Sequence, residues 1–478
     1  MSQSLEPAHL EERKRTRPAW AVLAVVCGGQ FLVVLDVSVV NVALPSMRTD
    51  LGLGETELQW VVSAYTLTFA GFLLLGGRLA DLFGRERTFL TGLGLFTAAS
   101  LVGGLAQEPW MLVTARAVQG LGSAVLAPTT LSIITTTFPE GPERTQAIGI
   151  WTAVGAGGGA TGGLIGGVLT SVLSWHWVLL VNVPIGALLL VSAALCLPLR
   201  RDELARRLDL SGAVLVTAGV AALAYGIAQS TPHGWASWQA LLPVAGSLAA
   251  LALFVLVESR TAEPLIPLRL FRIRSVSVAN TVLLTAGAAT LPVWYFLTLY
   301  MQNLLHYSPV QTGLCFLPQT VSVVLSSTLS PRLMKHVDAR LIGAAGGLLA
   351  AGGMVWQSTL TVHGTFLGTI LGPGILTMTG AGLLMTPITA AATSRVPAPE
   401  QGAVSGVLNT SSQLGGALGL TVLTAAASGR ISSHAQSGVI APEELTAGYS
   451  LAFLTGSAFL LAGVLLTALL PKPVLREE

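Results

Sequence analysis

Long apolar blocks follow one another along this chain and constrain its fold more than any other feature. Each block has about 20 residues, the length that a helix needs to cross roughly 30 Å of hydrocarbon. We count about fourteen blocks, centred near residues 31, 67, 97, 123, 157, 187, 219, 248, 289, 320, 350, 376, 415 and 460. Only 10% of the 478 residues are charged, against about 25% in soluble domains. The sequence therefore predicts an all-α polytopic membrane protein.

Basic residues lie on alternate sides of these blocks. If the N-terminus is cytoplasmic, 22 of the 25 Lys and Arg residues lie in cytoplasmic segments, while Arg48 and Arg430 lie outside and Arg116 lies within a span. Because basic residues concentrate on the cytoplasmic side of membrane proteins, we expect both termini in the cytoplasm and an even number of spans. Only three of the basic residues are Lys, and Ala, Gly and Leu abound. This usage is typical of a GC-rich bacterial gene and points to a bacterial plasma membrane.

Two cytoplasmic turns have similar sequences. GGRLADLFGRERTFLTGLG follows the second block at 76–94, and SPRLMKHVDARLIGAAGG follows the tenth at 330–347. Arg78 aligns with Arg332 at an offset of 254 residues, which contains eight blocks. We interpret this as a parallel repeat of six-helix halves with two extra helices between them, an organisation known from transporters. The alternative is that basic turns look alike because they all obey the same charge rule.

The repeat predicts the division of the chain. We expect a cytoplasmic tail at 1–18, a six-helix bundle at 19–198, a linker with two extra transmembrane helices at 199–260, a second six-helix bundle at 261–471 and a cytoplasmic tail at 472–478. The first apolar run is too long for a cleavable signal peptide.

Two charged residues lie well inside the predicted spans. Asp36 stands nine residues before Pro45, and Arg116 stands seven residues after Pro109. Both therefore lie roughly 10–14 Å below the outer boundary of the bilayer. A charge at the bilayer centre costs roughly 3 kcal/mol or more, so an acid and a base at equal depth would relieve each other's cost. Charges inside a membrane belong to substrate pathways or proton relays more often than to purely structural contacts. The alternative is a structural pair that only holds two helices together.

Six motifs resemble those of one transporter family, in the right order along nearly the whole chain. GRLADLFGRER (77–87) resembles the loop signature of the major facilitator superfamily, LVTARAVQGLGSA (112–124) its fourth-helix motif, and LDVSVVNVALP (35–45) the first-helix motif of its fourteen-span drug:proton antiporters. LQWVVSAYTL (58–67), WHWVLLVNVPIG (175–186) and SGVLNTSSQLGGALG (405–419) are similar to further family motifs. The chain departs from the family at Gly163, where Pro is usual, and at His176, where Arg is usual.

The resemblance implies a fold and an activity. The fold would be two six-helix bundles plus two extra central helices, 14 transmembrane helices in all. The activity would be proton-coupled antiport, exporting small hydrophobic drugs, antibiotics or similar metabolites by alternating access. We expect Asp36 to carry the proton and Arg116 to pair with it. Because Arg116 favours the carboxylate anion, the pair must separate or rehydrate during each cycle.

A second face of the first helix carries amides. Gln30 and Asn41 are eleven residues apart, hence about 20° apart around a helix, while Asp36 lies about 120–140° from them. We expect this amide face to line a substrate cavity, together with Tyr65, Gln119, Trp294, Tyr300, Gln302, Asn409 and Gln413. For each single amide, hydrogen bonding between helices is the alternative.

Glycines and one cytoplasmic turn supply the expected gate. Gly155, Gly159, Gly163 and Gly167 form a row with a spacing of four, and such rows let another backbone approach closely. The resemblance implies that this helix packs on the other half as a sliding seam. It also implies that Asp81 caps a helix of the other half and holds the cytoplasmic gate closed. The other residues expected in this gate are Gly77, Gly84, Arg85 and Arg144.

Other functions remain as alternatives. The chain could be a proton symporter importing a metabolite, a membrane-embedded enzyme or a channel. We expect no enzyme, because the seven His residues are scattered and paired catalytic groups are lacking. The sequence contains no Gly-x-x-x-x-Gly-Lys phosphate-binding motif, and its three Cys residues form no metal or redox motif. We therefore expect no cofactor and no metal. The expected partners are a small hydrophobic or amphipathic substrate, protons and the lipid bilayer, without nucleic acid, and the protein is expected to be a monomer.

Overall fold

The computed structural model describes residues 19–138, 142–197, 210–261, 264, 268–393, 396, 401–432 and 441–470, and every regular element in them is a helix. Eleven helices in these residues are long and apolar enough to cross a membrane. With α2, α3 and α8 they make fourteen long helical segments. The predicted fold class is confirmed.

The N-terminal helices are α1 (Ala19–Leu51), α2 (Glu55–Phe83), α3 (Arg85–Gly104), α4 (Pro109–Thr137), α5 (Pro142–Val172), α6 (His176–Leu180) and α7 (Asn182–Cys196). A hairpin of α8 (Leu210–His233) and α9 (Trp238–Arg260) follows. The C-terminal helices are η1 (Leu268–Arg272), α10 (Arg274–Leu299), η2 (Tyr300–Leu304), α11 (Pro309–Leu333), α12 (Ala339–Gln357), η3 (Phe366–Leu371), α13 (Gly372–Thr393), α14 (Gln401–Ser432) and α15 (Pro442–Thr467).

Local sequence signals set the helix ends. Pro109 occupies the first turn of α4, where its missing N–H costs nothing. Before α11, the Ser308 hydroxyl accepts from the Gln311 backbone N–H and the Gln311 side chain accepts from the Ser308 N–H, which satisfies two unpaired donors at once. Gly84, at φ +86°, makes the sharp turn between α2 and α3, a conformation that glycine adopts without steric cost.

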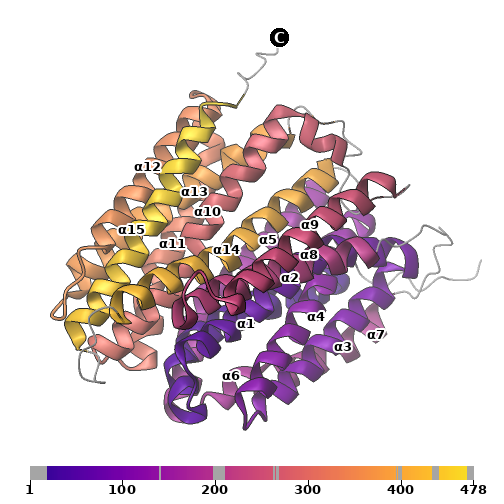
Figure 1. The fold of residues 1–478 in the computed structure, drawn as a ribbon. Helices are drawn as coiled ribbons and strands as arrows, with labels where there is room; N and C mark the ends of the chain where they lie inside the picture. Colours follow the sequence, from indigo (N-terminus) through magenta and orange to yellow (C-terminus); the bar gives the residue numbers. More distant parts are fainter. Residues whose placement is uncertain are drawn as a thin grey trace, which may run out of the picture.

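The helices pack as two groups. In the N-terminal group, α1 packs against α4, α5 and α7, and α4 also packs against α2 and α3. In the C-terminal group, α10 packs against α14 and α15, and α12 packs against α13 and α15. Figure 1 shows the first group in indigo and purple on one side and the second in orange and yellow on the other. The residue boundaries assigned to these units from the sequence remain a prediction.

The two groups meet along two seams, α5 with α11 and α2 with α14. The contacts between the groups cluster at the end of the bundle where α1 ends, which we call the Leu51 end; the opposite end is the Ala19 end. Here the backbones of Gly163 and Gly313 touch. Across the second seam, Gln59 Nε2 donates to Thr421 Oγ1 at 2.7 Å. The Leu51 end is therefore the closed end of this conformation.

The α8–α9 hairpin lies against the second seam. It turns at Gly234, which has φ +83°, and α8 packs against both α2 and α14 (Figure 1). The contact is apolar and consists of Leu67, Leu75, Val216, Val220, Ala224, Phe254, Val407 and Ala417. The hairpin therefore touches both groups without belonging to the core of either.

The orientation of the helices can be tested with two introduced cysteines. Ala236, in the α8–α9 turn, and His336, in the α11–α12 turn, are both exposed and lie at opposite ends of the bundle. In a variant lacking the native Cys27, Cys196 and Cys315, we expect Ala236→Cys to react with a membrane-impermeant maleimide in intact cells. His336→Cys should react only after permeabilisation. The reverse labelling pattern would reject the orientation derived from the basic residues.

The seam predicts a difference between two glycine substitutions. A Cβ added to Gly313 would overlap the carbonyl oxygen of Gly163, whereas one added to Gly163 would lie 3.4 Å from Gly313. We therefore expect Gly313→Ala to force α5 and α11 apart and to open the Leu51 end in a larger share of molecules. The measurement is the spin-label distance between Val172 and His306. Gly163→Ala is the matched control and should keep the wild-type distance; equal distances in both variants would contradict the prediction.

Candidate functional site

Asp36 and Arg116 form a salt bridge inside the N-terminal group. Arg116 Nη1 donates to Asp36 Oδ2 at 2.6 Å, and the two side chains are 0% and 2% exposed. The contact expected from their equal depths is therefore present. Each charge removes the main cost of burying the other, provided that the remaining polar atoms also find partners.

Amides and a hydroxyl complete the surroundings of the carboxylate. Gln119 Nε2 and Asn182 Nδ2 donate to Asp36 Oδ1 at 3.1 and 2.8 Å. Gln119 also accepts from Arg116 Nη1 at 2.9 Å and donates to Ser100 Oγ at 2.7 Å. Asp36 thus accepts three hydrogen bonds, from Arg116, Gln119 and Asn182. Three donors around one carboxyl group are the environment of a carboxylate anion.

Arg116 has partners besides the carboxylate. Its Nε donates to the backbone carbonyl of Val61 at 3.1 Å, and its guanidinium carbon lies 4.3 Å from the centre of the Tyr65 ring, a cation–π contact. The Tyr65 hydroxyl donates to Ser123 Oγ at 2.9 Å, which holds the ring in place. These contacts satisfy part of the hydrogen-bonding capacity of Arg116 independently of Asp36.

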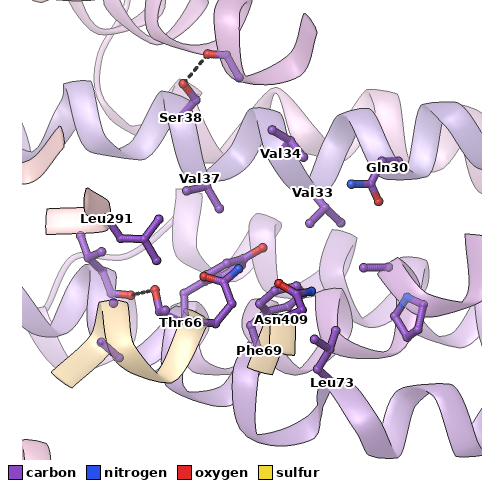
Figure 2. A pocket seen from close by; sticks show the side chains of 18 of the residues that line it. Gln30, Val33, Val34, Val37, Ser38, Thr66, Phe69, Leu73, Leu291 and Asn409 are labelled. Carbon is purple, nitrogen blue, oxygen red and sulfur yellow. Dashed lines mark hydrogen bonds between the residues drawn. The ribbon is translucent and has the colours of Figure 1, made fainter. Parts of the chain in front are cut away.

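A cavity of about 1170 Å³ lies beside this cluster, between the two groups of helices. In Figure 2, Gln30, Val33, Val34 and Val37 lie along one helix, across the cavity from Asn409 and other lining side chains. Asp36 is not part of this wall, because it lies on another face of α1. The aromatic lining residues are Tyr65, Phe69, Trp151, Trp294, Tyr295 and Phe316, and the amides are Gln30, Asn41, Asn409 and Gln413. None of the lining side chains that the structure describes carries a charge.

Tyr65 is shared between the cavity and the ion pair. It lines the cavity, and its ring lies against the guanidinium of Arg116. It is only 3% exposed. The aromatic ring therefore separates a buried charge pair from a space that can hold a small molecule.

The cavity reaches from the middle of the bundle toward the Ala19 end. Lining residues at that end are Gly77 near the end of α2, Thr135 near the end of α4, Trp151 early in α5 and Ser405 early in α14. The contacts between the groups at the Leu51 end close its other side. If the Ala19 end is cytoplasmic, as the basic residues predict, this conformation receives molecules from the cytoplasm.

Six of the nine residues expected in the substrate site line the cavity: Gln30, Asn41, Tyr65, Trp294, Asn409 and Gln413. The structure places the other three elsewhere. Gln119 is held by the ion pair and Ser100. The Tyr300 side chain is buried, and its hydroxyl donates to the Thr361 carbonyl at 2.7 Å. Gln302 Nε2 donates to the Val42 carbonyl at 2.8 Å, between the two groups. Their hydrogen bonds hold these three side chains outside the cavity in this conformation, so their assignment to the substrate site stays a prediction.

The residues expected in the gate occupy different places. Gly77 and Gly159 line the cavity, whereas Gly163 and Gly167 lie against α11 at the closed seam. Arg85, beside Gly84, starts α3 and is half-buried, and Arg144 Nε donates to the Phe138 carbonyl at 3.0 Å. The side chain of Asp81 lies outside the described residues, so its capping role stays a prediction.

Three polar residues around the Asp36–Arg116 pair were not predicted from the sequence: Ser100, Ser123 and Asn182. Ser100 and Ser123 are small hydroxyl residues within apolar runs and carry no sequence signal of their own. Asn182 lies in the quoted motif WHWVLLVNVPIG, where a lone amide within an apolar segment was the available signal. Among the described residues, no group of three or more His, Cys, Asp or Glu side chains could hold a metal ion.

The ion pair predicts unequal costs for its two neutral variants. Asp36→Asn leaves a guanidinium that cannot lose its proton, and breaking a buried pair in this way costs about 3–5 kcal/mol. Arg116→Gln should cost less, because the remaining carboxylate can take up a proton. The double variant should recover most of the loss, since neither charge remains. Thermal unfolding of the purified variants measures the order; additive losses in the double variant would show that the two charges do not stabilise each other.

Comparison with known proteins places this geometry in a family. Residues 26–420 match the family described as Major Facilitator Superfamily. The cephamycin export protein CmcT of Amycolatopsis lactamdurans is 50% identical over 461 residues, which cover 96% of this chain and 93% of that protein. The puromycin resistance protein pur8 of Streptomyces alboniger is 40% identical over 460 residues, which cover 94% and 90%.

A solved structure gives the same fold. The inward open conformation of the xylose transporter XylE from E. coli superposes with a TM-score of 0.64 at 12% identity, over 96% of this chain and 98% of that one. At this identity the likeness concerns the fold alone. Family match, relatives and fold agree: the chain is a membrane transporter and belongs to the major facilitator superfamily.

Proposed function

We propose that this protein exports small antibiotic-like molecules across the bacterial plasma membrane in exchange for protons. The observation that carries the proposal is the buried Asp36–Arg116 pair beside a cavity whose wall includes Tyr65, the ring that contacts Arg116. The names of the relatives, an export protein for cephamycin and a resistance protein for puromycin, support export rather than import.

The cavity supports an amphipathic substrate. Ligand sites are mostly apolar with a few placed polar groups, in volumes of roughly 300–1,000 Å³. This cavity is slightly larger, at about 1170 Å³, and combines aromatic rings with side-chain amides. Such a surface binds ring systems by stacking and their carbonyl, hydroxyl or amide groups by hydrogen bonds. Because the described lining residues are uncharged, they recognise a substrate through these contacts.

Asp36 supports the proton half of the exchange. As an anion it accepts three hydrogen bonds and holds α1 against α4, α7 and, through Gln119, α3. Protonation removes the attraction to Arg116 and turns one carboxylate oxygen from an acceptor into a donor. Arg116 retains Gln119, the Val61 carbonyl and the Tyr65 ring. Proton binding would therefore weaken the attachment of α1 to α4, and these neutral partners would offset part of the cost of the remaining cation.

Coupling between proton and substrate would follow from the wall that the proton site and the cavity share. A molecule in the cavity contacts one side of Tyr65 and of α1, while the proton site lies behind them. Opening of the pair would let α1 and α2 shift relative to α4, and such a shift changes the shape of the cavity. Proton and substrate would then be exchanged through one movement of the same helices, although they bind to different groups.

Transport by inside-out membrane vesicles tests the proposal. With an acidic lumen, we expect accumulation of cephamycin- or puromycin-type compounds, and loss of this accumulation in Asp36→Asn. Without a proton gradient, Asp36→Asn should still exchange substrate down the substrate's own concentration gradient, because its cavity is intact. Asp50→Asn is the matched control, since Asp50 is an exposed carboxylate in the last turn of α1. Its Oδ2 accepts from Trp175 Nε1 at 2.7 Å, a bond that the amide oxygen of Asn can also accept, so this variant should transport like the wild type.

Two outcomes would overturn the proposal. Full proton-driven accumulation by Asp36→Asn would make Asp36 a structural residue. Proton movement in the same direction as the substrate would identify a symporter. If Asp36→Asn fails to fold, the double variant with Arg116→Gln replaces it in the same measurement.

A further inference from the structure

Asn182 has one unused hydrogen-bonding atom at the proton site. It is the first residue of α7 and is 0% exposed. Its Nδ2 donates to Asp36 Oδ1 at 2.8 Å, whereas its Oδ1 is buried and has no hydrogen-bond partner. Buried polar atoms are nearly always paired, so an exception calls for a physical explanation.

The other donors to Asp36 cannot exchange their roles. Arg116 can only donate. Gln119 uses both ends of its amide, because Oε1 accepts from Arg116 while Nε2 donates to Asp36 and Ser100. Turning the Gln119 amide over would break these bonds together. Asn182 is different, since its second atom has no bond to lose.

A protonated Asp36 needs an acceptor that this arrangement lacks. Its new O–H would face the amide N–H groups of Gln119 and Asn182 on one oxygen, or the guanidinium of Arg116 on the other. Two donors that face each other form no hydrogen bond. Rotation of the Asn182 amide by half a turn about its last side-chain bond, a torsion with broad preferences, would bring Oδ1 to the place of Nδ2.

We propose that Asn182 is a positioning residue that follows the protonation state of Asp36 by turning its amide over. Toward the carboxylate it donates through Nδ2, and toward the carboxylic acid it accepts through Oδ1. The exchange needs no other partner to move and gives the new O–H an acceptor. The inference rests on the proposed role of Asp36 as proton carrier.

Few ionisable groups can interfere with this exchange. Arg116 of α4 and Tyr65 of α2 face Asp36 and interact with it electrostatically. The other described ionisable side chains on the elements that pack against α1 are Glu57, Glu143, Arg144, His176, Cys196, Arg274, Tyr295, Cys315 and Arg332. The groups that would change together are Asp36 and Asn182, and the Asp36–Arg116 contact would change with them.

Infrared difference spectroscopy of the purified transporter during acidification tests the inference. We expect a carboxylic-acid C=O band, assigned to Asp36 by its absence in Asp36→Asn, to rise together with a shift of a side-chain amide C=O band. Both changes should share one midpoint. In Asn182→Leu, which has similar size but neither donor nor acceptor, the amide change should vanish, and proton-driven export should fall roughly 10- to 100-fold, as expected for losing one charge-assisted hydrogen bond.

Asn280→Leu is the matched control. Asn280 is also a buried Asn, but it lies on α10, where it donates to the Val276 carbonyl and accepts from Ser411. This variant should keep the amide change and its shared midpoint. An amide band that does not follow the carboxyl band, or a wild-type pH profile of export in Asn182→Leu, would overturn the inference. Loss of export in Asp36→Asn together with either result would refute the role of Asn182 alone, whereas proton-driven export by Asp36→Asn would refute the proton carrier itself.

Discussion

The salt bridge between Asp36 and Arg116 is the contact on which the packing of the N-terminal helices depends. Neither charge is stable alone in a medium that offers no water, so each requires the other and both require further donors and acceptors. These partners come from five helices: α1, α2, α3, α4 and α7. One carboxylate thus fixes the relative positions of most of a six-helix bundle, and a change in its charge acts on all of them.

The structure separates the charged groups from the space for the substrate. α1 presents Asp36 to α4 and α7, while Gln30, Val34 and Asn41 line the cavity on another face of the same helix. A substrate therefore does not have to replace the partners of the carboxylate in order to bind. Tyr65 is common to both places, because it lines the cavity and its ring contacts Arg116. The proposed exchange through a shared wall would tolerate substrates of different shapes, because the carboxylate would not depend on a bond to any of them.

Periodicity and depth were sufficient to predict the helices, the contact between Asp36 and Arg116, and the two polar faces of α1. They could not predict how the amides of other helices are used. Gln119 lies one turn after Arg116 and is held by hydrogen bonds to the ion pair. Whether it bonds to the pair or faces the cavity depends on the distances of α4 from α1 and α3. Tyr300 and Gln302 lie in η2, a π-helical segment that turns its residues away from the positions of an α-helix, and no sequence pattern indicated it. Asn182 gains its importance only from the fold, because 146 residues separate it from Asp36.

The position of the α8–α9 hairpin has a consequence for access from the lipid. A compound dissolved in the hydrocarbon could reach a central cavity between two bundles through either seam, without passing through water. α8 lies over the seam between α2 and α14 and fills it with aliphatic side chains such as Val216 and Val220. That lateral route is closed in this conformation. The extra hairpin thus makes the transporter asymmetric toward the membrane around it, and a lipophilic compound must approach by the α5–α11 side or from the aqueous mouth at the Ala19 end.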